Sequence, residues 1–269
     1  MFRILLLAAA IAGLSWFQFV NSASARDVGR NAVDLFDPRP ARDILFVGNS
    51  RIFTNDLPSM VRAVADSADA PVKYRVRMWA LPGRSFSDHA QNESVKALLA
   101  ERWDRVILQA QSAEQLGRDR RIDFQLYGSQ LIDRARASGS PASLVVNWTY
   151  SEEKMREIDW SRSKAYALIQ RDHRTLARAS RAGLINVGTA FRRVEAARPD
   201  LDLTPDGNHP SPHGTYIYAL MVYAHLSGAD VRRVRFVPEG VSAADALALR
   251  ELVNDYLTSG AGPAAAPAA

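Results

Sequence analysis

Apolar and polar positions along the chain follow two periods, one typical of buried strands and one typical of amphipathic helices. Residues 44–47 form an uninterrupted apolar run that enters Gly48-Asn49-Ser50, as a short buried strand ending in a tight turn would. Residues 74–79 alternate apolar with basic side chains, which indicates a strand with one wet face near a sheet edge. Similar short apolar runs predict further strands at residues 106–108, 144–148 and 184–187.

Segments with apolar residues at helical spacing separate these strands. Leu57, Met60, Val61 and Val64 recur at that spacing, and Pro58 suits the first turn of such a helix. The same pattern predicts further helices at residues 95–103, 121–137, 161–182, 215–226 and 242–257. Strands separated by helices pair in parallel through right-handed crossovers. The sequence therefore predicts an α/β fold, a three-layer α/β/α sandwich with a mainly parallel, five-stranded sheet.

The first 25 residues carry the features of a secretory signal peptide. Arg3 precedes an apolar stretch at residues 4–14, and Ala23-Ser24-Ala25 is a small-residue cleavage site. We expect cleavage after Ala25, export to the periplasm or the extracellular space, and no stable membrane anchor afterwards. The alternative is an uncleaved anchor, because the longer stretch at residues 4–20 reaches the short limit of a spanning helix.

The rest of the chain divides into three parts. A polar, proline-containing lead-in at residues 26–40 precedes one folded domain at residues 41–258, and residues 259–269 form an alanine- and proline-rich tail that we expect to be disordered.

Composition excludes several classes of function. The chain has no cysteine, which rules out disulfides, thiolate metal sites and a lipoprotein anchor. The net charge of +5 is modest, and the basic residues form no stripe with interleaved aromatic residues, so we expect no nucleic-acid partner. Composition leaves the oligomeric state open.

Candidate chemistry lies in two stretches. Ser50 leaves the predicted strand at the sheet edge where α/β proteins bind ligands, although a serine there could simply cap the next helix. Asp206 lies three residues before His209 in a loop rich in proline and glycine. If that loop covers Ser50, His209 would take the serine proton and Asp206 would orient the imidazole. We predict Ser50, His209 and Asp206 as nucleophile, base and orienting acid.

A metal site is the alternative use of this loop. His209 and His213 are four residues apart and Asp206 is close by. Pro210 and Pro212 argue against a regular helix that would bring both rings to one face. The sequence predicts no metal and no cofactor.

An acyl-serine mechanism also needs hydrogen-bond donors for the developing oxyanion. The predicted donors are the backbone N–H groups of Ser50 and Gly83 and the side-chain amide of Gln111, with Gln109 as the substitute for Gln111. Residues that could line the pocket are Asn49, Gln109 and His89. His173 lies among charged neighbours in the sequence and is predicted to be solvated.

These residues resemble the SGNH (GDSL) hydrolases, a superfamily of serine esterases and acyl hydrolases. The likeness spans residues 43–226 and is most specific in the Gly48-Asn49-Ser50 block and the Asp206-x-x-His209 block. It implies a flavodoxin-like sheet and ester or acyl hydrolysis without a metal. By the same resemblance, Ser50 is the nucleophile, His209 the base, Asp206 its orienting acid and Gly83 part of the oxyanion hole.

Two positions depart from the superfamily pattern. Asn49 stands where the serine block usually has aspartate, and the G-x-N-D block is absent after the third strand. Gln109-Ala110-Gln111-Ser112 stands in its place and is similar to the Leu-Gln-x-Gln-Ser run of one branch of the superfamily. That likeness assigns the role of the missing asparagine to Gln111.

The sequence thus predicts an exported serine esterase that cleaves a carboxylic ester, such as an acyl or acetyl group on a small molecule, a glycan or a lipid. Two alternatives stay open. One is a weak or inactive protein of the same fold that binds polysaccharide, and the other is an acyltransferase that uses the same three residues.

Overall fold

The computed structural model describes residues 37–259. The chain separates into two units, Met1–Pro40 and Ala41–Ala269, and the second contains the sheet. The predicted signal peptide lies outside the described residues, as do most of the predicted lead-in and tail. Within residues 37–259, no helix is long and apolar enough to cross a membrane.

The centre of the second unit is one sheet of five parallel strands. Its order is β2-β1-β3-β4-β5, and each neighbouring pair runs parallel. The strands are β1 (Ala41–Gly48), β2 (Lys73–Ala80), β3 (Arg105–Gln109), β4 (Ala142–Val145) and β5 (Gly183–Ile185). The predicted α/β class and five-stranded sheet are confirmed. Strand β2 occupies an edge, as its alternation of apolar and basic residues indicated.

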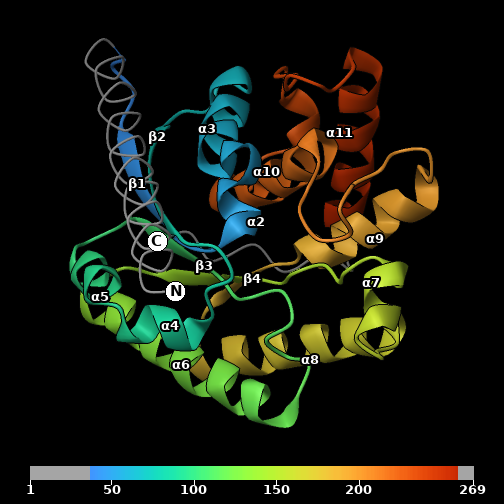
Figure 1. Ribbon diagram of the computed structural model, residues 1–269. Coiled ribbons are helices and arrows are strands. Elements are labelled where there is room, and N and C mark those ends of the chain that lie inside the picture. Colours follow the sequence, from blue (N-terminus) through green and yellow to red (C-terminus); the bar gives the residue numbers. More distant parts are fainter. Residues whose placement is uncertain (1–36, 260–269) are drawn as a thin grey trace, which may run out of the picture. The chain divides into compact units, whose positions relative to one another are not determined.

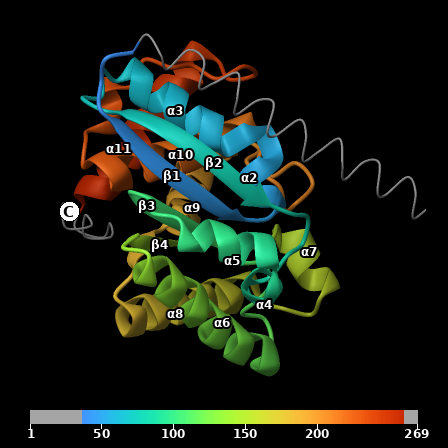
Figure 2. The same ribbon diagram turned by 90° about the vertical axis from the view of Figure 1, so that its left-hand side faces the viewer.

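Helices cover both faces of the sheet (Figure 1). One layer contains α3 (Leu57–Ser67), α9 (Val187–Ala197), α10 (Pro212–Ser227) and α11 (Ala243–Thr258). The other contains α4 (Phe86–Gln91), α5 (Glu93–Ala100), α6 (Arg118–Ala137) and α8 (Arg162–Ser180). Figure 2 shows the sheet between the two layers. Shorter elements are α2 (Ser50–Phe53), α7 (Glu152–Glu157) and the 3-10 turns η1 (Thr54–Asp56) and η2 (Val231–Arg233).

Strand β1 explains why its sequence is apolar without alternation. Ile44 and Phe46 belong to the core under α3 and α10, whereas Leu45 and Val47 belong to the core under α5 and α6. A central parallel strand is buried on both faces, so all four side chains are 1% exposed or less. Burying each one contributes about 1.5–3 kcal/mol, which fixes β1 in the centre of the fold.

The prediction was wrong at the junction between β5 and α9. Val187 was predicted as the end of the fifth strand, but β5 ends at Ile185 and Val187 begins α9. Asn186 is the N-cap, and its side chain accepts a hydrogen bond from the Thr189 N–H at 3.2 Å. This cap ends the strand early. The strand predicted at residues 144–148 likewise ends earlier, at Val145.

His173 is also corrected. Its ring is fully buried on α8, packs 4.8 Å from the Phe124 ring and bonds the Ile169 carbonyl oxygen through Nδ1 at 2.8 Å. Burial lowers the pKa of His173 to about 4, so the ring is neutral and structural. Of the charged neighbours of His173, Arg171 and Arg174 are exposed while Asp172 is buried with it, a division that the linear sequence does not reveal.

Candidate active site

The site begins where β1 turns into α2. Gly48 ends the strand, Asn49 is the N-cap and Ser50 is the first residue of the helix. A Cβ on Gly48 would lie 2.6 Å from Ile52 Cδ1 and 2.8 Å from Gln109 Oε1. A larger residue here would therefore force the Ile52 and Gln109 side chains to shift. Because the sheet is parallel, Ser50 emerges at the same edge as the loops after β2, β3 and β4.

The structure brings together the three residues predicted for catalysis. Ser50 Oγ lies 2.8 Å from His209 Nε2, although 159 residues separate them. His209 Nδ1 lies 2.6 Å from Asp206 Oδ2. The second carboxylate oxygen of Asp206 accepts hydrogen bonds from the backbone N–H groups of Asn208 at 2.8 Å and His209 at 2.7 Å. The loop thus folds back on itself as the Asp-x-x-His spacing predicted.

The electrostatics of Asp206 suit a partner for imidazolium. The side chain is half exposed, and its limited loss of hydration acts to raise the pKa, but the hydrogen bonds from the His209 ring and from the backbone of His209 and Asn208 outweigh that effect. The pKa of Asp206 therefore lies well below its usual range, and the carboxylate is charged at neutral pH. A carboxylate at Nδ1 favours the tautomer with its proton there, which leaves Nε2 to accept the Ser50 proton.

Asn49 lies beneath the site rather than on a pocket wall. Its side chain is 2% exposed, and its Nδ2 donates to the backbone oxygens of Arg84 and Ala110, each at 3.2 Å. Its Oδ1 accepts from the Arg51 N–H at 3.3 Å. The residue beside Ser50 therefore ties the loop after β2 to the loop after β3. An aspartate could not donate either of the two hydrogen bonds to carbonyl oxygens.

Gln109 is buried beside Asn49 and belongs to the same hydrogen-bond network. Its Oε1 accepts from the Asn49 N–H at 3.2 Å, and its Nε2 donates to Asn147 Oδ1 at 3.2 Å. Asn147 Nδ2 in turn donates to the Ala110 oxygen at 2.9 Å. With its side chain fully buried and both ends occupied, Gln109 supports the loops and does not face a ligand.

His89 is buried beneath the site as well. Its side chain is 1% exposed, it lies close to the Gly48 backbone, and its Nε2 has no hydrogen-bond partner within residues 37–259. Burial lowers the pKa of His89 to about 4 against the opposing effect of the nearby Gly48 backbone, so the ring is neutral. Its contact with Gly48 makes it a support of the turn that carries Ser50, and the structure does not place it on a pocket wall.

Three predicted oxyanion donors remain available at this edge. Gln111 Oε1 accepts from the Ala113 N–H at 2.8 Å, which orients the side chain and leaves its amide N–H₂ unused. Gly83 has a left-handed φ of +67°, and nothing lies within 4 Å of the position a Cβ would take. Within residues 37–259, no acceptor pairs with the Gln111 amide or with the N–H groups of Gly83 and Ser50.

Glu114 connects the two loops that carry Gly83 and Gln111, and sequence reasoning missed it. Its side chain is 3% exposed, and it accepts from the N–H groups of Phe86 at 3.0 Å and Gln111 at 2.9 Å. Burial raises the pKa of Glu114 to about 7 against those hydrogen bonds. A glutamate three residues after Gln111, in a polar loop, gives no sequence signal for this position. Sequence reasoning also missed Arg51 and Asn208, because neither residue shows in the sequence which distant groups it bonds.

Comparison with protein-family models and with curated protein sequences finds no match. Solved structures do match. A protein from Slackia heliotrinireducens described as a candidate SGNH hydrolase is 26% identical, with a TM-score of 0.60 over 70% of this chain and 100% of that one. This chain has the SGNH hydrolase fold. The predicted resemblance is confirmed at that level.

Two further structures share this SGNH fold at lower identity. A DUF4886 family protein from Bacteroides uniformis is 17% identical, with a TM-score of 0.67 over 81% of this chain and 95% of that one. A lipase/acylhydrolase from Enterococcus faecalis is 17% identical, with a TM-score of 0.55 over 70% of this chain and 96% of that one.

Other features of this SGNH domain lie apart from the three residues. His213 Nε2 lies 3.5 Å from Asp245 Oδ2 on α11. No cluster of three or more His, Cys, Asp or Glu side chains that could hold a metal ion occurs in the described part of the chain.

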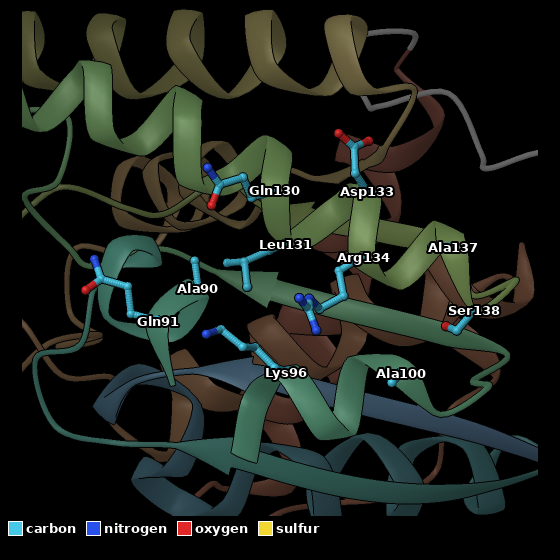
Figure 3. A pocket seen from close by; sticks show the side chains of 10 residues that line it. All are labelled: Ala90, Gln91, Lys96, Ala100, Gln130, Leu131, Asp133, Arg134, Ala137 and Ser138. Atoms are coloured by element: carbon cyan, nitrogen blue, oxygen red, sulfur yellow. The ribbon is translucent and has the colours of Figure 1, made fainter. Parts of the chain in front are cut away.

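A cavity of about 830 Å³ lies between α4, α5 and α6 (Figure 3). Lys96 and Arg134 are among the residues that line it, and none of these belongs to the Ser50, His209 and Asp206 set.

Proposed function

We propose that this protein is a serine hydrolase that cleaves carboxylic esters, with acyl or acetyl groups as the transferred part, through an acyl-Ser50 intermediate. The observation that carries the proposal is the 2.8 Å contact between Ser50 Oγ and His209 Nε2, with Asp206 2.6 Å behind the ring. Structural neighbours described as a lipase/acylhydrolase and as an acetyl xylan esterase support an ester as the substrate class.

In the first half of the reaction, Ser50 Oγ attacks the ester carbonyl carbon while His209 Nε2 takes the hydroxyl proton. The ring becomes imidazolium, which the ionised Asp206 stabilises. The tetrahedral intermediate then collapses, the bond to the leaving oxygen breaks, and His209 gives its proton to the departing alcohol. The acyl group is left on Ser50.

In the second half, water replaces the alcohol. His209 Nε2 takes one proton from the water as its oxygen attacks the acyl carbon. Collapse of the second tetrahedral intermediate breaks the bond to Ser50 Oγ, and the proton on His209 returns to that oxygen. The products are a carboxylic acid and the free enzyme.

The oxyanion of both intermediates needs donors. In the proposal this role is filled by the N–H groups of Ser50 and Gly83 and by the side-chain amide of Gln111. Each stabilises the transition state by about 3 kcal/mol. Support comes from their lack of acceptors within residues 37–259 and from Asn49, which ties their two loops to the turn at Ser50.

The alternative of an inactive binding protein rested on Asn49 and on the missing G-x-N-D block. The hydrogen bonds of Asn49 give that residue a structural reason, and Gln111 supplies an unused amide after β3. Neither feature requires a loss of catalysis. Acyl transfer differs from hydrolysis only in the attacking alcohol, so analysis of products with and without a sugar acceptor separates the two.

Export is a second part of the proposal. Arg3, the apolar stretch at residues 4–14 and Ala23-Ser24-Ala25 support a cleaved signal peptide. N-terminal sequencing of the protein recovered outside the cytoplasm is expected to begin at Arg26. A sequence that begins at Met1 would contradict cleavage.

Turnover of p-nitrophenyl acetate by matched variants tests the activity. Ser50→Ala and His209→Ala are each expected to lower kcat by about 10⁴-fold, since removing one member of such a set removes its joint action. Ser87→Ala on α4 is the control and is expected to keep full turnover. Circular dichroism verifies that each variant is folded. Full turnover by folded Ser50→Ala would refute the proposal.

A further inference from the structure

Arg51, the residue after the proposed nucleophile, is completely buried. Burial lowers the pKa of its guanidinium to about 9, so the group still carries its charge at neutral pH. Within residues 37–259 no carboxylate lies within ion-pair distance of it, the Asp206 carboxylate acts on it only from farther away, and its Nη2 has no hydrogen-bond partner. Desolvating such a cation costs several kcal/mol, and an apolar side chain of the same size often gives a more stable protein. Stability alone therefore does not explain an arginine here.

The contacts of Arg51 join two distant parts of the chain. Its Nε donates to Asn208 Oδ1 at 3.1 Å, and its Nη1 donates to the Trp148 carbonyl oxygen at 2.8 Å. The guanidinium carbon also lies 4.2 Å from the centre of the Trp148 ring, in a cation–π arrangement. Arg51 thus connects helix α2, which begins with Ser50, to the loop after β4 and to the loop that carries His209.

Asn208 is the point at which this loop is held. Besides Arg51, its Oδ1 accepts from Ser112 Oγ at 3.3 Å, and its backbone oxygen accepts from Trp148 Nε1 at 3.0 Å. Its own N–H donates to Asp206 Oδ1 at 2.8 Å. Because Asn208 lies directly before His209, a displacement of Asn208 moves both the imidazole and its carboxylate partner.

We propose that Arg51 is a positioning residue, which uses its fork of donors on Asn208 and Trp148 to hold His209 Nε2 within hydrogen-bond distance of Ser50 Oγ. Nucleophile and positioning residue are adjacent on one helix, so the contact between Ser50 and His209 is set by one rigid element. The kinetic part of this inference rests on the proposed function, because it concerns the same three residues.

The test compares Arg51→Met, Arg51→Lys and Asn208→Ala with Arg105→Met. Methionine keeps most of the side-chain length without donors, and lysine keeps the charge but cannot bond Asn208 and Trp148 with one planar fork. Arg105 is the control because it is a partly buried arginine with an unpaired Nε at the start of β3, the opposite end of the sheet from Ser50.

Three readouts are made on folded protein well below each melting temperature. For Arg51→Met we expect kcat on p-nitrophenyl acetate to fall by about 100-fold with KM within about threefold, as a misplaced base would cause. Arg51→Lys is expected to recover part of that loss. The double variant Arg51→Met/Asn208→Ala is expected to lose no more than the worse single variant, because both residues hold one loop. Arg105→Met is expected to keep wild-type kcat.

The first two readouts are kcat and KM, and the third, an NMR signal, does not depend on turnover. The proton between His209 Nδ1 and Asp206 should give a far-downfield NMR signal in the wild type and in Arg105→Met, and that signal should be lost in Arg51→Met.

Two outcomes would overturn the inference. One is wild-type kcat together with an intact signal in folded Arg51→Met, and the other is additive losses of kcat in the double variant. If Arg51→Met does not fold, Arg51→Lys and Asn208→Ala decide in the same way. A wild type with the signal but without turnover would refute the proposed function and leave the positioning role to the NMR comparison.

Discussion

The side-chain amide of Asn49, the N-cap of α2, donates a hydrogen bond to the Ala110 carbonyl oxygen at 3.2 Å in the loop after β3. A second hydrogen bond from the same nitrogen reaches the Arg84 oxygen in the loop after β2. Two loops with proposed oxyanion donors are therefore held by the residue beside the proposed nucleophile. The asparagine that departs from the superfamily pattern is required by its surroundings in this chain.

Asn49→Asp tests this requirement. An aspartate would direct a carboxylate oxygen at two carbonyl oxygens and lose both hydrogen bonds, so we expect a loss of about 3 kcal/mol in the free energy of unfolding. Asn92→Asp is the matched control. Asn92 caps α5 by accepting from the Val95 N–H at 3.1 Å, which a carboxylate also does, so its effect should stay within about 0.5 kcal/mol. Equal stability of Asn49→Asp and wild type in urea titrations would contradict the assigned hydrogen bonds.

Gly48→Ala tests the close approach at the end of β1. The added Cβ would displace Ile52 and the Gln109 side chain, whose Oε1 accepts from the Asn49 N–H. We expect a loss of about 3 kcal/mol in the free energy of unfolding, together with reduced turnover. Gly139→Ala is the control. It has open space but a φ of +78° at the end of α6, so it should cost about 1 kcal/mol and leave turnover unchanged. Wild-type stability and turnover in Gly48→Ala would show that the turn is less tightly packed than described.

Glu114 predicts a pH dependence of stability. Burial raises its folded-state pKa from 4.5 to about 7, so folding favours the protonated form. The stability it contributes is complete below pH 4.5 and is lost as the pH rises through 7. From pH 5 to pH 8, we expect wild type to lose up to about 3 kcal/mol of unfolding free energy relative to Glu114→Gln.

Urea titrations of wild type and Glu114→Gln at several pH values measure that difference. Glu251→Gln, an exposed position on α11, is the control and should parallel wild type at every pH. A difference between wild type and Glu114→Gln that does not vary with pH would show that Glu114 does not titrate in this range.

Local sequence patterns were sufficient to predict the sheet and the proximity of Ser50, Asp206 and His209. The apolar run before Gly48 placed β1 and, with it, Ser50 at the sheet edge. The spacing of Asp206 and His209 was informative because the carboxylate and the ring bond each other within one loop. Strand β2 was placed at the edge because only one of its faces is apolar.

Features that depend on distant partners could not be predicted in this way. Arg51 bonds partners 97 and 157 residues away, and a single arginine after a serine carries no sign of either. Gln109 and Gln111 look equivalent in the sequence, yet one is buried under Asn49 and the other retains an unused amide. Helix α4 was missed although Ser85 and Asp88 form a capping box, because six residues are too few to show a helical period.

Reaction of the purified protein with a fluorophosphonate probe, followed by peptide mapping, tests most directly whether Ser50 is an activated nucleophile. An adjacent base makes a serine react where ordinary serines do not. We expect a single labelled site at Ser50, with labelling lost in His209→Ala and retained in Ser87→Ala. Absence of label at Ser50 in the folded wild type, or equal labelling of Ser50 in His209→Ala, would contradict the proposed catalytic role of the pair.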